Sequence, residues 1–430
     1  MRILIATDSF PPGCGGSGWS TFELARGLRA RGHSLAIVQP RPGGRSGTRE
    51  YGGFLVRVIG APAPAVPYVR NYFKNERLAA RLAPLLAEAV RTGHVDVIHA
   101  QHVLTAPASV AAARQAGIPS VCTVRDYWPV CYWSDLIYDR AADSLCPSCT
   151  PGMMTRCVRP RAGAVWPLAL PMIPYMRANL ARKRLALASS AAVVAVSTVI
   201  GADLLARAPE LAATRVEVIP NPVDVEAIHA AAREGPRPSD GPYALFVGKL
   251  APNKGVSKLV PAAEHARLPW PLVVIGDGPD RGVIETAARR TGRDVRLLGW
   301  LPREATLGWM ARASLLVFPS YGPESLSRVL LESAALALPI AAMDTGGTRD
   351  IVIDGETGLL TSTSAAALGE AVARLVADRT LASRLAAGAR AHVEAAFGAA
   401  GVAERIERLY GDVIATRRGG ARTDPSGGPA

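Results

Sequence analysis

The sequence predicts an α/β fold of two doubly wound domains, each built on a parallel sheet. Short β-branched, apolar runs alternate with helical patterns along the first half of the 430 residues, stop in a proline- and glycine-rich stretch, and then start again. Glycine-rich turns follow several of the apolar runs. Because such folds bind ligands at the carboxyl ends of their strands, we expect a ligand in the cleft between the two halves.

The first half, residues 1–222, contains the first set of alternating patterns. Apolar runs of four to six residues predict strands, and apolar residues at helical spacing predict helices between them. The expected strands are 3–7, 33–38, 95–100, 120–124, 192–196 and 216–219, and the longer expected helices are 17–31, 71–91, 105–115 and 176–188. An irregular insertion is expected at about 125–176.

The second half begins after a loop-rich boundary, and we expect its domain to span 223–397. Its expected strands are 243–247, 272–275, 295–298, 315–318 and 339–343. A helix over 398–416 is expected to pack back on the first domain. The polar Gly/Pro tail, 417–430, is expected to be disordered.

Composition indicates a cytoplasmic protein. The N-terminus becomes acidic at Asp8, too early for a signal peptide, and the longest apolar candidate, 165–176, is interrupted by three prolines. The six cysteines are then expected to be thiols or metal ligands rather than disulfides.

The net charge of +13 is unevenly distributed. Residues 1–220 hold 25 Lys/Arg against 13 Asp/Glu, whereas 221–430 hold 24 against 23. A charge confined to one half argues against a nucleic-acid partner. It fits an anionic acceptor or peripheral association with an anionic membrane, and an arginine-rich bias with a solvated surface explains it equally well.

A glycine-rich loop follows the first strand at residues 11–18. It matches G-x-G-x-x-G, but two prolines intervene before it and the second strand ends without an acidic residue, so NAD binding is disfavoured. Gly15 and Gly16 allow close backbone approach to a ligand ahead of a helix; a flexible turn is the alternative.

Two glutamates frame the most informative stretch. A buried strand ends at Pro319, and a helical pattern starting near Glu324 carries Glu332. On a helix the two carboxylates would stand roughly 12 Å apart along the axis and about 80° around it. With the free first-turn amides between them, they suit a nucleoside-diphosphate sugar; two solvated glutamates are the alternative.

Other strand ends in this half carry complementary groups. Lys249 and Lys254, beside a strand end and a helix start, suit a diphosphate. Gly276 and Gly278 follow the next strand, where a flat base or ribose could pack. Recurrence of such turns at one sheet edge predicts a site there.

This ordered series resembles the family-4 group of retaining glycosyltransferases with the GT-B fold, over about residues 1–415. The matching motifs in the second half are Gly248-Lys249-Leu250 with Asn253-Lys254-Gly255, Gly276-Asp277-Gly278-Pro279, Leu298-Gly299-Trp300, Pro319-Ser320 with Glu324-x7-Glu332, and Asp354-Gly355-Glu356-Thr357-Gly358. Those in the first half include Phe10-Pro11-Pro12 with Gly15-Gly16, Asp96-Val97-Ile98-His99 and Ile219-Pro220-Asn221-Pro222.

The resemblance implies that Glu324 contacts the transferred sugar, Glu332 the ribose, and Lys249 and Lys254 the diphosphate, with no cofactor or metal needed for transfer. Lys249 stands where arginine is usual, which keeps the charge but loses the bidentate fork. The further donor-binding positions implied are Gly16, Gly248, Asn221, Gly276, Gly278, Ser325 and Leu326.

Arg125 is a second departure. It precedes Asp126 where the family often has a histidine near the transferred sugar. An arginine cannot act as a general base; it could bind an anionic donor sugar or acceptor, or turn away. His102, with Gly15 and Asp126, is an acceptor-side candidate, and His99 is a possible substitute, although a core or capping histidine is the alternative for both.

Four cysteines and a basic, apolar stretch remain. Cys131, Cys146, Cys149 and Cys157 have plausible spacing for structural zinc, with free thiols or an iron–sulfur cluster as alternatives. The stretch from Trp166 to Arg184 could rest on a membrane that presents a lipid-linked acceptor, or be a hydrophobic docking segment with a solvated basic end.

The sequence therefore predicts a retaining, metal-independent hexosyltransferase that uses a nucleotide-diphosphate sugar, with UDP- or GDP-sugars favoured. The acceptor is a glycan, a lipid-linked or a small molecule. A catalytically silent relative that binds a sugar nucleotide or glycan is the alternative, suggested by Arg125 and Lys249.

Overall fold

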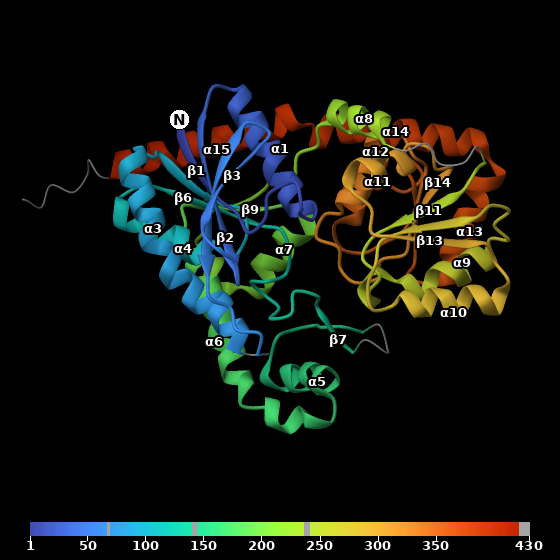
Figure 1. Ribbon diagram of the computed structural model, residues 1–430, viewed down its shortest axis with the longest axis horizontal. Coiled ribbons are helices and arrows are strands. Elements are labelled where there is room, and N and C mark those ends of the chain that lie inside the picture. The colour runs from blue at the N-terminus through green and yellow to red at the C-terminus, as the bar shows by residue number, and fades with distance from the viewer. Residues whose placement is uncertain (67–68, 140–143, 236–240, 421–430) are drawn as a thin grey trace, which may run out of the picture. The chain divides into compact units, whose positions relative to one another are not determined.

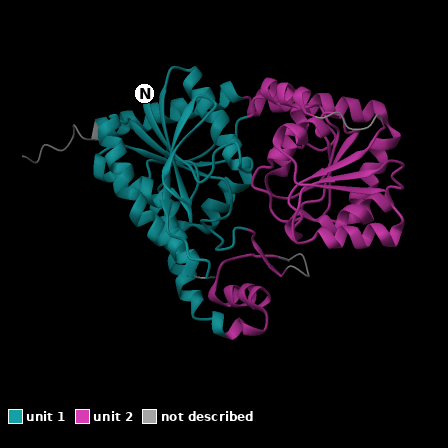
Figure 2. Cartoon of the chain, in the orientation of Figure 1, with its two compact units in different colours: residues 1–134, 168–222, 399–430 teal, residues 135–167, 223–398 magenta. Residues whose placement is uncertain are grey.

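The computed structural model describes residues 1–66, 69–139, 144–235 and 241–420 in two compact units (Figures 1 and 2). The first comprises residues 1–134, 168–222 and the chain from Ala399 onward; the second comprises 135–167 and 223–398. Each unit holds a mostly or wholly parallel sheet with helices around it, which confirms the predicted fold class. Among the described helices, none is both long and apolar enough to cross a bilayer.

The first unit is built on an eight-stranded sheet in the order β10-β9-β6-β5-β1-β2-β4-β3. All strands are parallel except β3, which pairs antiparallel with β4. This β3–β4 hairpin was not among the predicted strands. The polar residues of β3 give it no apolar run, whereas β4 is an apolar run that the prediction omitted. The strands are β1 (Arg2–Ala6), β2 (Ser34–Pro42), β3 (Gly47–Tyr51), β4 (Phe54–Ala61), β5 (Val97–Ala100), β6 (Ser120–Val124), β9 (Ala192–Ala195) and β10 (Val216–Val218).

Helices cover this sheet and close its core. They are α1 (Gly16–Ala30), α2 (Val69–Tyr72), α3 (Leu78–Gly93), α4 (Ala106–Ala116), α6 (Met172–Ala188), α7 (Thr198–Arg207) and α15 (Ala399–Gly420), with a π-helical turn at Phe73–Arg77. The C-terminal helix α15 buries Val402, Ile406 and Leu409 in the same apolar cluster as Ile3 and Ile5 of β1. It therefore completes the core of the first unit.

The second unit is built on a six-stranded parallel sheet in the order β13-β12-β11-β14-β15-β16. Its strands are β11 (Ala244–Val247), β12 (Leu272–Ile275), β13 (Val295–Gly299), β14 (Leu315–Phe318), β15 (Ile340–Met343) and β16 (Leu359–Thr361). Its helices are α8 (Val225–Glu234), α9 (Leu259–His265), α10 (Arg281–Thr291), α11 (Arg303–Met310), α12 (Arg328–Ala335), α13 (Ala365–Ala377) and α14 (Arg379–Phe397). The central strands are fully apolar because helices cover both faces.

The stretch expected as an irregular insertion of the first domain is more ordered than predicted, and residues 135–167 group with the second unit. It forms a hairpin of β7 (Ile137–Asp139) and β8 (Ser144–Leu145), then α5 (Pro151–Ala162) and a 3₁₀ segment, η2 (Gly163–Ala169). Thr150 caps α5 by accepting from the Met153 amide. Arg161 ties α5 to the hairpin through Asp135 and the Ile137 carbonyl.

The boundary expected at residue 416 is also wrong, because α15 runs to Gly420. Arg417 and Arg418 lie in its last turn, where cations interact favourably with the helix dipole. The rest of the expected disordered tail, 421–430, lies outside the described residues.

Candidate functional site

In the second unit, the polar groups gather where the sheet order reverses. Strand β11 lies between β12 and β14, so the loops after β11 and β14 leave neighbouring strands at this switch point. Open α/β sheets bind ligands at such a point. The loops cross-link, since the Gly322 amide donates to the Asn253 carbonyl.

Glu324 is fixed at this switch point. Its carboxylate accepts a hydrogen bond from the buried Ser320 hydroxyl at 2.7 Å and forms an ion pair with Lys254. Its carbonyl accepts from the Gly347 amide at 2.7 Å. The side chain is 8% exposed, so its orientation is set before any ligand binds.

Glu324 does not begin a helix, contrary to the sequence prediction. Helix α12 begins at Arg328, after an extended Ser327 whose hydroxyl caps it by accepting from the Leu330 amide. The glutamate bonds to neighbouring loops instead, so the predicted helical separation from Glu332 does not apply. The amides of Ser325 and Leu326 donate no hydrogen bond to any described residue, and they stay available to an anion.

Glu332, in contrast, is held by two arginines. One carboxylate oxygen accepts from Arg303 at 2.9 Å and from Arg328 at 3.0 Å, and the residue is 7% exposed. Burial by itself would raise the pKa of Glu332, but the two guanidiniums outweigh it and lower the pKa below its ordinary 4.5. The carboxylate is therefore charged and clamped.

The remaining predicted donor residues of the second unit lie at the same sheet edge, whereas Gly16 and Asn221 belong to the first unit. Lys249 is exposed and forms no ion pair within the described part of the chain. Gly276 has φ +136°, and a Cβ there would lie 1.8 Å from the Gly248 carbonyl oxygen. Only glycine fits this crossing of two loops. Gly278 is a second such position, because a Cβ there would lie 2.3 Å from the Leu250 carbonyl oxygen.

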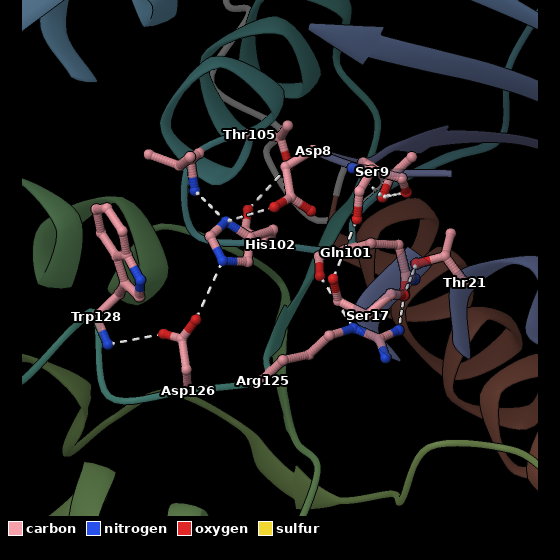
Figure 3. A network of polar contacts seen from close by, with 12 residues as sticks. Asp8, Ser9, Ser17, Thr21, Gln101, His102, Thr105, Arg125, Asp126 and Trp128 are labelled. Carbon is pink, nitrogen blue, oxygen red and sulfur yellow. Dashed lines mark hydrogen bonds and ion pairs between the residues drawn. The ribbon is translucent and has the colours of Figure 1, made fainter. Parts of the chain in front are cut away.

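In the first unit, the polar network lies beyond the ends of β1, β5 and β6 (Figure 3). His102 donates through Nε2 to Asp126 at 3.1 Å, because its Nδ1 already accepts from the Leu104 amide at 3.2 Å. Asp8 lies 3.8 Å from Nδ1. Burial would lower the pKa of His102, but Asp8 and Asp126 outweigh it and raise the pKa.

Arg125 points into its own unit. Its Nε donates to the Gln101 carbonyl at 3.1 Å, and its two Nη atoms donate to the side chains of Gln101 and Asn221 (Figure 3). The residue is 7% exposed. The amide oxygen of Asn221, an expected donor contact, is thus engaged by Arg125.

His99 is a core histidine. It is fully buried and its two ring nitrogens contact the hydroxyls of Tyr410 and Thr123. Burial and then Arg125 lower the pKa of His99 to about 3. It is therefore unavailable as the substitute considered above for a catalytic histidine.

Beside His102 lies a buried ammonium that the sequence did not single out. Lys183 of α6 is 4% exposed, makes no hydrogen bond within the described residues, and lies 4.2 Å from the Trp128 ring centroid. Burial lowers the pKa of Lys183 to about 7, against the opposing effects of Asp126 and Glu76. Lys74 lies 5.8 Å from the same ring and lowers it further.

We expect Lys183→Met to stabilise the protein at pH 6 by an amount on the order of 3 kcal/mol. Because the folded-state pKa lies below the unfolded one, the penalty is complete below about pH 7 and fades as the pH rises toward 10. Thermal unfolding at pH 6 and pH 10 measures it, with Arg177→Met, an exposed cation of the same helix, as the control. A gain that is equal at both pH values would contradict this account.

The zinc expectation is not supported. Among the described residues, no three His, Cys, Asp or Glu side chains gather as metal ligands. Cys131 lies in the first unit, whereas Cys146, Cys149 and Cys157 lie in the second. The cap and the Arg161 contacts order this segment instead.

Several site residues were missed by the sequence analysis. Ser320, named above only within a motif, lies two residues after β14, and Asp8 lies two residues after β1. Their places at strand ends are a signal that could have found both. Arg303, Arg328 and Lys183 gave no such signal, because basic residues on amphipathic helices usually face solvent.

Comparison with known proteins identifies the class. Residues 14–227 match the family described as Glycosyltransferase Family 4, and residues 228–392 match the one described as Glycosyl transferases group 1. The chain belongs to the family-4 type of glycosyltransferases, which has the GT-B fold and uses nucleotide sugars.

The chain is similar to proteins that it matches over nearly their whole length. It is 28% identical to the alpha-maltose-1-phosphate synthase of Mycobacterium tuberculosis, covering 96% of this chain and 100% of that protein. The sucrose-phosphate synthase of Thermosynechococcus elongatus superposes with a TM-score of 0.73 at 20% identity, covering 96% and 99% of the two chains. The Anabaena protein HepE in complex with UDP-glucose gives 0.61 at 18%, covering 96% and 100%.

Proposed function

We propose that this glycosyltransferase moves a hexosyl group, with retention of configuration, from a UDP- or GDP-sugar to a glycan, lipid-linked or small-molecule acceptor. One observation carries the proposal. A buried carboxylate, Glu324, is fixed by Lys254 and Ser320 at the switch point of the second unit, beside the unbonded amides of Ser325 and Leu326. The arrangement places a carboxylate that can contact a sugar beside amides that can bind an anion.

The mechanism follows from these charges. Lys249, Lys254 and the two amides bind the diphosphate and stabilise the charge that grows as it leaves. Glu324 stabilises the oxocarbenium-like sugar, and Glu332 faces the ribose. The leaving phosphate takes the acceptor proton on the same face, so the step needs no metal ion.

The first unit supplies the acceptor side in this proposal. Gly15 directly precedes α1 at the sheet edge, and His102 and Asp126 form the polar pair at the neighbouring strand ends, whereas Gly16 is kept as a donor contact. We also propose that the protein works in the cytoplasm, with its basic first half against the inner face of a membrane. The uneven charge supports this placement.

A panel of UDP, GDP, ADP and their sugars tests the donor. A nucleotide present at about 100 times its dissociation constant should raise the melting temperature by roughly 5 °C, because it binds only the folded state. The binding sugar nucleotide should then be hydrolysed or transferred. Binding without turnover for every donor would favour the silent relative, and no binding at all would refute both.

A further inference from the structure

In one segment of the chain, every charged side chain is basic. Between residues 144 and 202 there are seven Lys and Arg residues and no Asp or Glu. Part of it folds as α5 and η2, outside the two sheets. The proposed transfer mechanism uses none of these residues.

A pocket of about 620 Å³ opens on this segment. Two exposed arginines line it, Arg156 and Arg159, and neither forms an ion pair with a described residue, whereas Arg161 is paired with Asp135. The guanidinium of Arg159 lies 5.6 Å from the Trp166 ring centroid. The other lining residues are Tyr138, Asp139, Pro160, Gly163 and Ala164.

The same segment exposes large apolar side chains. Val165 is 60% exposed and Leu168, two residues beyond Trp166, is 82% exposed. Leu168 is the most exposed of the large apolar residues in the described chain. Surfaces that lie in a bilayer interface typically combine apolar side chains with unpaired arginines and an indole ring, as this segment does.

We propose that Arg156 and Arg159 of α5, together with Val165, Trp166 and Leu168 of the single 3₁₀ segment η2, form a membrane-contact surface for anionic phospholipid. The arginines hold lipid phosphates at the pocket, and Val165 and Leu168 enter the acyl boundary. This inference rests on the proposed membrane association and gives it a location and a lipid class. A soluble polyanion would need only the two arginines as binding groups. The exposed Leu168 would then have no role in binding.

Vesicle co-sedimentation of the full chain tests the surface. The protein should bind phosphatidylcholine vesicles containing about one third phosphatidylglycerol and should not bind pure phosphatidylcholine. Removing two charges with Arg156→Gln/Arg159→Gln should weaken binding about 30-fold, at roughly fivefold for each basic residue. Val165→Ser/Leu168→Ser should weaken it at least about tenfold.

Helix α10 offers matched controls. Arg289→Gln/Arg290→Gln removes the same charge, and Val283→Ser removes an exposed apolar side chain from the same unit. Both should leave vesicle binding within about twofold. Equal losses in the controls, binding to neutral vesicles, or release of the protein by millimolar inorganic phosphate would overturn the proposal.

Donor hydrolysis in solution separates this inference from the proposed function. The Arg156, Arg159, Val165 and Leu168 variants should hydrolyse the donor at the wild-type rate. Normal hydrolysis without vesicle binding by the wild type would refute the surface alone. Vesicle binding by a wild type that turns over no donor would refute the transferase function alone.

Discussion

Glu324→Gln should lower turnover about 10³-fold while the nucleotide still binds. In the proposed mechanism the substitution removes a negative charge that faces the developing positive sugar. At a separation of about 4 Å such an interaction is on the order of 4 kcal/mol at an effective dielectric constant of about 20. The glutamine keeps the shape and can still accept from Ser320. Steady-state transfer rates and the dissociation constant of the nucleotide measure the two effects.

Glu285→Gln is the matched control, because Glu285 is a partly exposed carboxylate on α10 of the same unit that is also paired with a cation, Arg281. It should leave turnover unchanged. If Glu324→Gln retained more than about a tenth of the wild-type turnover, its carboxylate would have no role in the transition state.

Glu332→Met should destabilise the second unit by about 3–5 kcal/mol, because it removes the buried carboxylate that Arg303 and Arg328 share. Chemical denaturation measures the loss. A triple change of Glu332, Arg303 and Arg328 to methionine should recover much of it, since all three charges of the cluster are then removed. If Glu332→Met had the same free energy of unfolding as the wild type, the ion-pair cluster would make no net contribution to stability.

The same cluster predicts a dependence on acid. The pKa of Glu332 is lower in the folded protein than its ordinary 4.5, so its contribution is complete above about pH 4.5 and is lost as the pH falls through the folded-state value. The difference between wild type and Glu332→Met should therefore shrink in acid. A difference that stays constant from pH 7 down to pH 3 would contradict the assignment.

The fold was predictable because its signals are local. Strands such as β11 and β14 are short, wholly apolar runs flanked by glycine and proline, and a strand buried on both faces needs that composition. Strand β3 was missed for the complementary reason. It is polar and exposed, and such a strand is defined by the partner that it pairs with. Its partner β4 does carry a local apolar signal, which the prediction omitted.

The site was predictable in its residues but less so in its geometry. Loops that end parallel strands meet at one edge, so Lys254 and Glu324 could be assigned to one site from their positions in the sequence. Their ion pair and the Ser320 contact came only from the structure. Glu324 bonds to other loops and Ser327 caps α12 from an extended conformation, and that competition cannot be read from a helical pattern.

Sequence by itself determined the class of this protein: two doubly wound halves, with lysines, glycines and Glu324 at strand ends in a fixed order. Tertiary structure alone decided what several charges do. Arg125 is bonded to Gln101 and Asn221, Glu332 is clamped by two arginines, and Lys183 is buried against Trp128. Chain order sets which strand end a residue follows, whereas burial and charge pairing depend on partners from distant segments.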